Sequence, residues 1–71
     1  MPSYSTDHLR TLVAVLDEGT FDAAASRLHV TASAVSQRIK AMEEATGQIL
    51  VQRTNPARAT DTGAIVARYA R

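Results

Sequence analysis

The segment TASAVSQRIKAMEEAT, residues 31–46, has the start and stop signals of a single helix. Thr31 is a suitable N-cap because its hydroxyl oxygen can accept hydrogen bonds from the free N–H groups of the first turn. Val30 and Val35 are spaced to form a hydrophobic staple across that start. Gly47 can end the helix, because glycine adopts the left-handed conformation without steric cost. We therefore predict a helix over residues 31–46.

The two sides of this predicted helix differ in chemistry. One side carries an apolar stripe that would pack against a core, formed by Val35, Ile39, Met42 and the methyl group of Thr46. The other side is polar and holds Ser33, Ser36, Gln37, Lys40 and Glu44, with Arg38 and Glu43 at its margins. Hydroxyl, amide and ammonium groups can contact base edges and phosphates in a DNA major groove. Taken alone, the same pattern also fits a helix whose polar side is only solvated.

Two shorter helices are predicted before this segment. The first is capped by Ser5 or Thr6, runs to about residue 18 and is stopped by Gly19. Its apolar side is formed by Leu9, Leu12, Val13 and Leu16. The second spans residues 21–28 behind the N-cap Thr20, and its apolar side is formed by Phe21, Ala24, Ala25 and Leu28. Only His29 and Val30 then lead into the segment 31–46. So short a connection makes two helices meet at a steep angle, as in a helix-turn-helix.

His29 lies where the chain must leave a helix abruptly. We expect it at positive φ, which histidine tolerates better than most residues. A catalytic or metal-binding role for His29 is disfavoured, because no second ligand lies near it in the sequence and His8 stands alone on the first helix.

Residues 49–60 predict a β-hairpin, or wing. Residues 49–53 have the composition of a strand, residues 54–57 contain the turn-forming pair Asn55-Pro56, and residues 58–60 can return as a second strand. Arg53 and Arg58 would lie at the two shoulders of the tip. A wing beside a helix-turn-helix commonly contacts the DNA backbone or the minor groove, where arginine is favoured. The alternative is that both arginines only keep the surface soluble.

A last helix is predicted over residues 61–71, with Thr60 as its N-cap. Gly63 lies in its first turn, where glycine costs about 1 kcal/mol relative to alanine. This position therefore suggests close packing against another element. Ile65, Val66 and Tyr69 give the helix an apolar side. No C-cap signal follows Arg71, so we expect the helix to continue in a longer protein.

Composition and charge narrow the classes of function. With 71 residues, 45% of them hydrophobic and 21% charged, the chain predicts one small globular domain. It has no cysteine, no apolar run of the roughly 20 residues that span a membrane, and no signal-peptide pattern. We expect a cytoplasmic protein without metal or other cofactor. Residues 1–31 hold four acidic against two basic residues, whereas residues 32–71 hold six basic against three acidic residues. Positive charge is thus concentrated in and after the predicted helix 31–46, as nucleic-acid binding requires.

The order GTFDAAASRLHVTASAVSQRIKAMEEATGQILVQRT…ATDTG resembles the N-terminal winged helix-turn-helix of LysR-type transcriptional regulators. The shared motifs are Gly19-Thr20-Phe21, Ala24-Ala25 with Leu28 and Val30, Ser36 with Ile39, Met42 and Glu43, Arg53, and Thr60 with Gly63. Many members carry Gln-Pro and Ser-Arg-Gln in their recognition helix, where this chain has Ala32-Ser33 and Ser36-Gln37-Arg38. This variant is similar to the branch that senses lysine and arginine and controls basic amino-acid export, the ArgP and LysG type. The resemblance implies promoter DNA with an inverted repeat as the partner and a homodimer built on the last helix. It also implies a small-molecule effector, with lysine and arginine as the candidates, bound by a domain absent from this chain.

We predict a mainly α fold, with a three-helix core, a hairpin wing and the start of a linker helix. Residues 1–60 would be the DNA-binding domain and residues 61–71 the start of the linker and dimerisation helix. The candidate DNA-binding residues are Thr20, Thr31, Ala32, Ser33, Ser36, Gln37, Arg38, Lys40, Arg53, Asn55 and Arg58. The candidate dimerisation residues are Ile65, Val66 and Tyr69. A winged helix that binds protein through the same polar helix is the alternative function. An enzyme is the weakest, because the sequence has neither a nucleophile motif nor a phosphate-binding loop.

Overall fold

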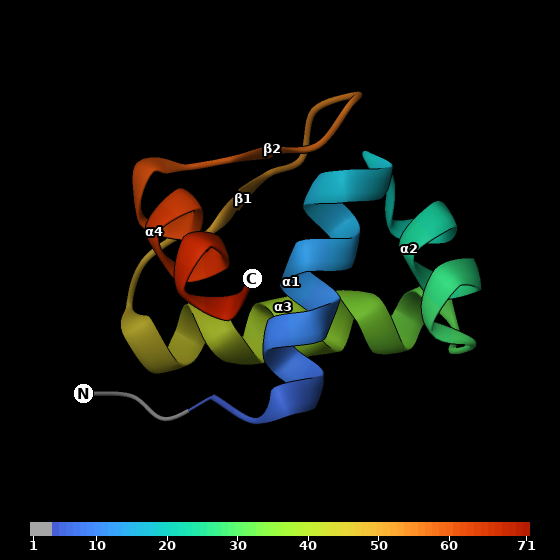
Figure 1. Ribbon diagram of the computed structural model, residues 1–71, viewed down its shortest axis with the longest axis horizontal. Helices are drawn as coiled ribbons and strands as arrows, with labels where there is room; N and C mark the ends of the chain where they lie inside the picture. The colour runs from blue at the N-terminus through green and yellow to red at the C-terminus, as the bar shows by residue number, and fades with distance from the viewer. Residues whose placement is uncertain (1–3) are drawn as a thin grey trace.

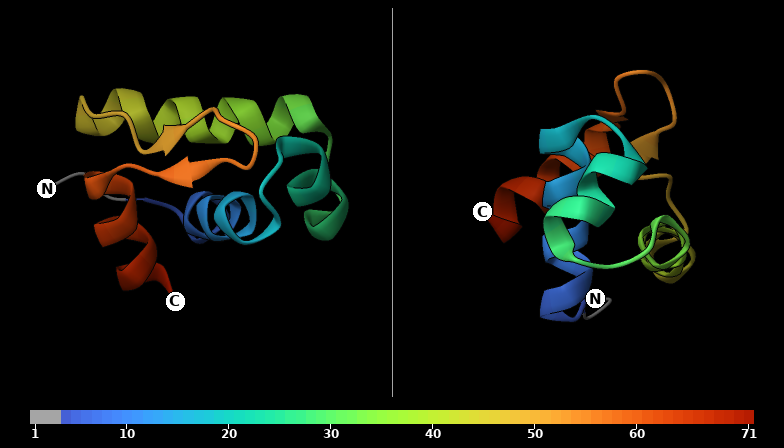
Figure 2. Two further views of the ribbon diagram at one scale, coloured as in Figure 1. Left: turned by 90° about the horizontal axis from the view of Figure 1, so that it is seen from above. Right: turned by 90° about the vertical axis from the view of Figure 1, so that its right-hand side faces the viewer.

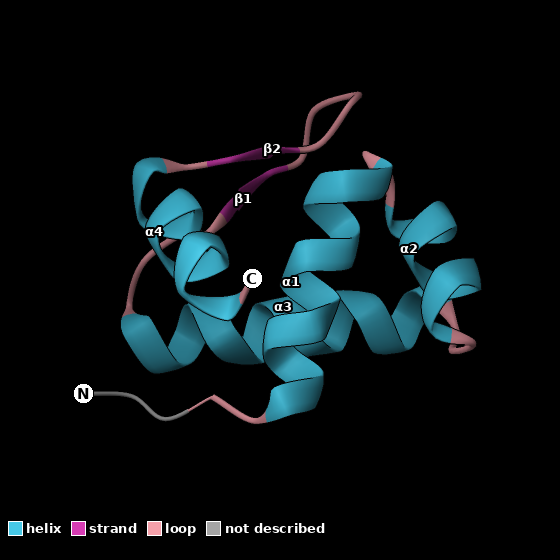
Figure 3. Ribbon diagram, in the orientation of Figure 1, coloured by secondary structure: helices cyan, strands magenta, loops and turns pink. Residues whose placement is uncertain are grey.

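A hydroxyl side chain caps the start of every helix in the computed structural model, which describes residues 4–71. Ser5, Thr20, Thr31 and Thr60 each accept a hydrogen bond from the backbone N–H three residues later, at 3.0–3.1 Å. These caps begin α1 (Thr6–Glu18), α2 (Phe21–Leu28), α3 (Ala32–Thr46) and α4 (Asp61–Ala70). The strands β1 (Val51–Gln52) and β2 (Arg58–Ala59) form the hairpin between α3 and α4 (Figures 1 and 3). The predicted winged helix-turn-helix is therefore confirmed.

Left-handed residues end the first three helices. Gly19, His29 and Gly47 have φ values of 83°, 59° and 70°. His29 is the non-glycine residue at positive φ among residues 4–71, as the sequence predicts. Its conformation lets the chain turn from α2 into α3 within a few residues, so that the two helices form a helix-turn-helix.

The strands are shorter than predicted. Residues 49–53 and 58–60 were expected to pair, but the ladder joins only Val51 to Ala59 and Gln52 to Arg58. Ile49 lies outside the ladder and is 61% exposed. Thr60 serves as the N-cap of α4 instead of continuing β2. The last helix ends at Ala70, one residue before the predicted end.

The core lies between α1, α3 and the hairpin. Its fully buried larger side chains are Leu12, Val15, Val35, Ile39, Met42, Leu50 and Val51. The apolar stripe predicted for α3 is confirmed at Val35, Ile39 and Met42. For α1 the prediction was partly wrong, because Thr11, Ala14 and Val15 join Leu12 in the core while Leu9 and Leu16 lie at its margin. The reason is that α1 packs against α2, α3 and α4 at once and buries a wider face than a single stripe.

The helices α2 and α4 lie at opposite ends of the molecule with α1 between them, and α3 runs along one side from the α2 end to the α4 end (Figures 1 and 2). On α4, Ile65 and Tyr69 are 66% and 86% exposed. Val66 differs from them, because it is half-buried and packs against the core. The predicted apolar side of α4 is therefore narrower than the sequence suggested. Within residues 4–71 no helix has both the length and the apolar character needed to cross a membrane.

Candidate nucleic-acid interface

The helix α3 presents its polar side to solvent along its first half. Thr31, Ser33, Gln37 and Lys40 are exposed, and Ala32 and Ser36 are half-buried. The opposite residues Val35, Ile39 and Met42 are completely buried, so they fix the rotation of the helix about its axis. The structure thus brings together five of the seven α3-region candidates on one outward side, whereas Ala32 packs against the core.

Arg38 is the candidate on α3 that the fold itself uses. Its Nη1 donates a hydrogen bond to Oγ1 of the buried Thr11, at 3.3 Å. The Thr11 hydroxyl in turn donates to the carbonyl oxygen of Asp7 at 2.7 Å. Arg38 therefore joins α3 to α1. The sequence could not indicate this contact, because Thr11 lies on a different helix within an apolar stretch.

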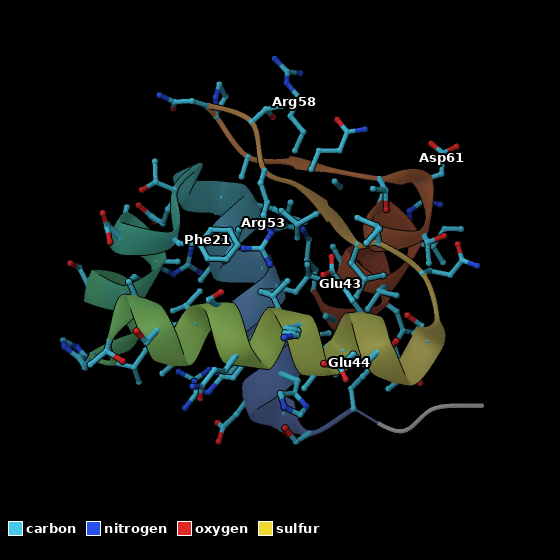
Figure 4. The ribbon with its side chains drawn as sticks, turned by 180° about the vertical axis from the view of Figure 1, so that it is seen from behind. Phe21, Glu43, Glu44, Arg53, Arg58 and Asp61 are labelled. Carbon is cyan, nitrogen blue, oxygen red and sulfur yellow. The ribbon has the colours of Figure 1, made fainter. Side chains whose placement is uncertain are left out.

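The two hairpin arginines lie on different faces of the hairpin. Alternation along β1 gives Arg53 the same face as the buried Val51. Arg58 pairs with Gln52 and shares the outward face with it. Figure 4 shows Arg58 pointing away from the molecule, whereas Arg53 reaches back to the ring of Phe21. The prediction that they lie as equivalent residues at the two shoulders of the hairpin tip is therefore wrong.

One shallow groove brings Thr20 together with Arg53 and Asn55. It runs between the start of α2 and the hairpin turn. Arg58 borders a second groove, together with Arg68 and Arg71, between the hairpin, the end of α1 and α4. Of the hairpin candidates, Arg53 and Asn55 therefore lie beside the helix-turn-helix, whereas Arg58 lies on the side of α4.

Glu43 is a residue whose role the sequence analysis missed. Its Oε2 accepts hydrogen bonds from the backbone N–H groups of Leu50 at 2.9 Å and Val51 at 3.3 Å. The last turns of α3 are thereby fixed to the beginning of the hairpin (Figure 4). Its position at the margin of the polar side, next to the exposed Glu44, was a weak signal for such a role.

Ion pairs gather at Asp17, at the end of α1. Its carboxylate contacts Arg71 at 2.6 Å and Arg27 at 3.2 Å, and Arg27 also reaches Glu18 at 3.5 Å. The hydrogen bond from Arg71, and then that from Arg27, hold the pKa of Asp17 below its ordinary value. All these side chains are substantially exposed, so solvent screens their attraction.

Three cationic candidates on α3 and the hairpin are not used in this way. Within residues 4–71 the ion pairs involve Arg27 and Arg71, and none involves Lys40, Arg53 or Arg58. These three exposed cations are therefore available to an anionic partner. The same described residues contain no group of three or more His, Cys, Asp or Glu side chains arranged to hold a metal ion.

Comparison with known proteins identifies the family. Residues 6–64 match the model of the bacterial regulatory helix-turn-helix proteins of the lysR family. The chain is 54% identical to the HTH-type transcriptional regulator LysG of Mycobacterium tuberculosis over 69 residues, which are 97% of this chain and 23% of that regulator. The chain thus spans about a quarter of the length of the curated relatives it matches.

Solved structures agree with the fold. Full-length LysG from Corynebacterium glutamicum with bound effector arginine superposes with a TM-score of 0.90 at 44% identity, covering 93% of this chain and 23% of that one. The DNA-binding domain of BenM in complex with benA site 1 DNA superposes with a TM-score of 0.88 at 34% identity, covering 93% of this chain and 75% of that one. The chain therefore belongs to the lysR family of bacterial regulatory helix-turn-helix proteins.

Proposed function

We propose that this chain binds promoter DNA sequence-specifically by inserting α3, its recognition helix, into the major groove. The observation that carries the proposal is the asymmetry of α3, which buries Val35, Ile39 and Met42 completely while Ser33, Gln37 and Lys40 stay exposed. An amide and hydroxyls can pair with base edges, and the ammonium group can contact phosphate. The family membership and the DNA complex of a 34% identical domain support this assignment.

The remaining candidates would position the helix on the duplex. Thr20, Arg53 and Asn55 border one groove beside the helix-turn-helix, where they can meet the backbone or the adjacent minor groove. Arg58 lies on the outer face of the hairpin and would contact the backbone from that side. Such contacts fix register and contribute affinity without reading sequence.

Binding measured over a range of salt concentrations tests the proposal. Duplexes selected by the protein from a random DNA pool should bind with a log Kd that depends steeply on log salt, because phosphate contacts release counterions. Arg58→Ala should weaken binding to all duplexes and flatten the salt slope by up to about 0.9. Gln37→Ala should instead relax the preference at one base pair by about 1–3 kcal/mol.

The proposal would be contradicted if no DNA sequence were enriched from the pool and if the residual binding to DNA did not change with salt. That result would favour a protein-binding winged helix. Equal losses on selected and random DNA for Gln37→Ala would remove Gln37 from the residues that read sequence.

We extend the proposal to the whole regulator. Residues 1–60 would be its DNA-binding domain and residues 61–71 the start of a linker helix, since the chain spans about a quarter of its relatives. The names of those relatives include a lysine export regulatory protein, and one structure holds arginine as effector. We therefore propose that a basic amino acid is the effector and that it binds the part of the regulator outside this chain. We propose an amino-acid exporter gene as the target and the nucleoid of the cytoplasm as the location.

A further inference from the structure

Arg53 and Phe21 form a stacked pair between the hairpin and α2. The Cζ atom of Arg53 lies 4.7 Å from the centroid of the Phe21 ring. Phe21 is the first residue of α2, and Arg53 follows β1 on the face that it shares with the buried Val51. Figure 4 shows the guanidinium beside the ring, above α3 in that view. The pair therefore joins the wing to the helix-turn-helix on the side of the recognition helix.

Both partners are held by contacts of their own. Phe21 is half-buried against the core, and the cap Thr20 fixes the turn that carries it. The hairpin is tied to the same turn, because the N–H of Ala57 donates to the carbonyl oxygen of Gly19 at 2.8 Å. Ring and guanidinium thus meet between two segments that already contact each other, so little additional order is needed for the stack.

The geometry of stacking leaves Arg53 able to bind an anion. A guanidinium that lies over a ring uses its flat face, and its five N–H donors remain at the edge of the plane. An ion pair with a carboxylate would occupy those donors, but the ion pairs within residues 4–71 do not include Arg53. The ring therefore restricts the rotamers of Arg53 without consuming its hydrogen-bonding capacity.

We propose that Phe21 is a positioning residue for DNA binding, which acts by holding Arg53 in the orientation that meets the duplex. This inference rests on the proposed function and adds a residue that itself need not contact DNA. A side chain that is already ordered loses less entropy on binding, and an ordered long side chain is worth about a two- to tenfold change in Kd. A ring that serves only the core would stabilise the domain without changing what Arg53 contributes.

A double-mutant cycle separates these two roles. The variants are Phe21→Leu, Arg53→Ala and their combination, with Kd measured by fluorescence anisotropy on a selected duplex. Phe21→Leu should weaken binding about two- to tenfold when Arg53 is present and leave Kd unchanged when Arg53 is alanine. Phe21→Tyr keeps an aromatic face and should bind like the parent protein. Arg58 supplies the matched control, because it lies on the outer hairpin face, so Phe21→Leu and Arg58→Ala should be additive.

Equal effects of Phe21→Leu with and without Arg53 would overturn the inference, as would tighter binding, which would mean that the ring holds Arg53 away from DNA. Should Phe21→Leu fail to fold, Arg53→Lys and Arg58→Lys give the answer. A stacked site prefers the planar guanidinium, so the lysine at position 53 should weaken binding more than the lysine at position 58. Equal losses would again overturn the inference. Failure of the proposed function itself would appear separately, as a parent protein that binds no selected duplex.

Discussion

Gly63 lies where the first turn of α4 crosses the backbone before β1. Its N–H donates to Oγ1 of Thr60, and the Thr60 hydroxyl donates to the carbonyl oxygen of Ile49 at 2.6 Å. The N–H of Thr60 also donates to the carbonyl oxygen of Leu50 at 3.1 Å. A methyl group at Gly63 would overlap the Leu50 carbonyl group. The close packing predicted from this glycine is therefore confirmed, and it fixes where α4 begins.

Gly63→Ala should destabilise the domain by about 1–3 kcal/mol, because the added methyl group meets backbone that cannot rotate away. Helix propensity alone would predict the opposite sign, a gain of about 1 kcal/mol. Ala64→Gly in the next, exposed position is the control and should cost about 1 kcal/mol through propensity. Urea denaturation measures both. A higher free energy of unfolding for Gly63→Ala would contradict the close contact.

Single residues were predictable where the rule that governs them is local. The caps Thr20, Thr31 and Thr60 and the left-handed His29 depend only on their neighbours in the chain, and all four are confirmed. The partners of Arg38 and Arg53 could not be predicted. Each lies on another element, so its position depends on how the helices and the hairpin pack. Val66 was assigned to a free surface for the same reason.

At the scale of elements, the helices were predicted to within a residue or two and the strands were not. Residues 49–53 have strand composition, yet the amides of Leu50 and Val51 donate to Glu43. The carbonyl oxygen of Ile49 is likewise taken by the Thr60 hydroxyl. Side chains thus bind the Leu50 N–H and the Ile49 carbonyl oxygen just before the ladder begins, and the hairpin stays short.

The link from α3 to the hairpin gives a prediction for Glu43. Glu43→Ala should lower the free energy of unfolding by about 1–3 kcal/mol, because two part-buried N–H groups lose their acceptor. Glu44→Ala is the matched control on the same helix, where an exposed side chain should change stability by less than about 0.5 kcal/mol. Thermal unfolding followed by circular dichroism compares the pair. Equal effects of the two substitutions would show that the Glu43 contacts contribute nothing.

The domain as a whole leaves apolar surface uncovered on α4. Ile65 and Tyr69 are four residues apart on one side of the helix, and both are mostly exposed. The other sides of α4 contact the core through Gly63 and Ala67, or border the groove beside Asp17. A second copy of α4 is a suitable cover. One recognition helix reads only a few base pairs, and a two-fold dimer doubles the contact on an inverted repeat whose halves lie about one helical turn apart.

We therefore predict that the chain dimerises through Ile65 and Tyr69 of α4. The double variant Ile65→Asp and Tyr69→Lys should stay folded, because both side chains are exposed, and it should sediment as a monomer. Its binding to an inverted repeat should fall to the level of an isolated half-site, since each helix then binds alone. Val66→Asp is unsuitable for this test, because Val66 packs against the core and a charged side chain there would destabilise the domain. A parent chain that sediments as a monomer at high concentration, yet binds an isolated half-site as tightly as the full repeat, would contradict the dimer.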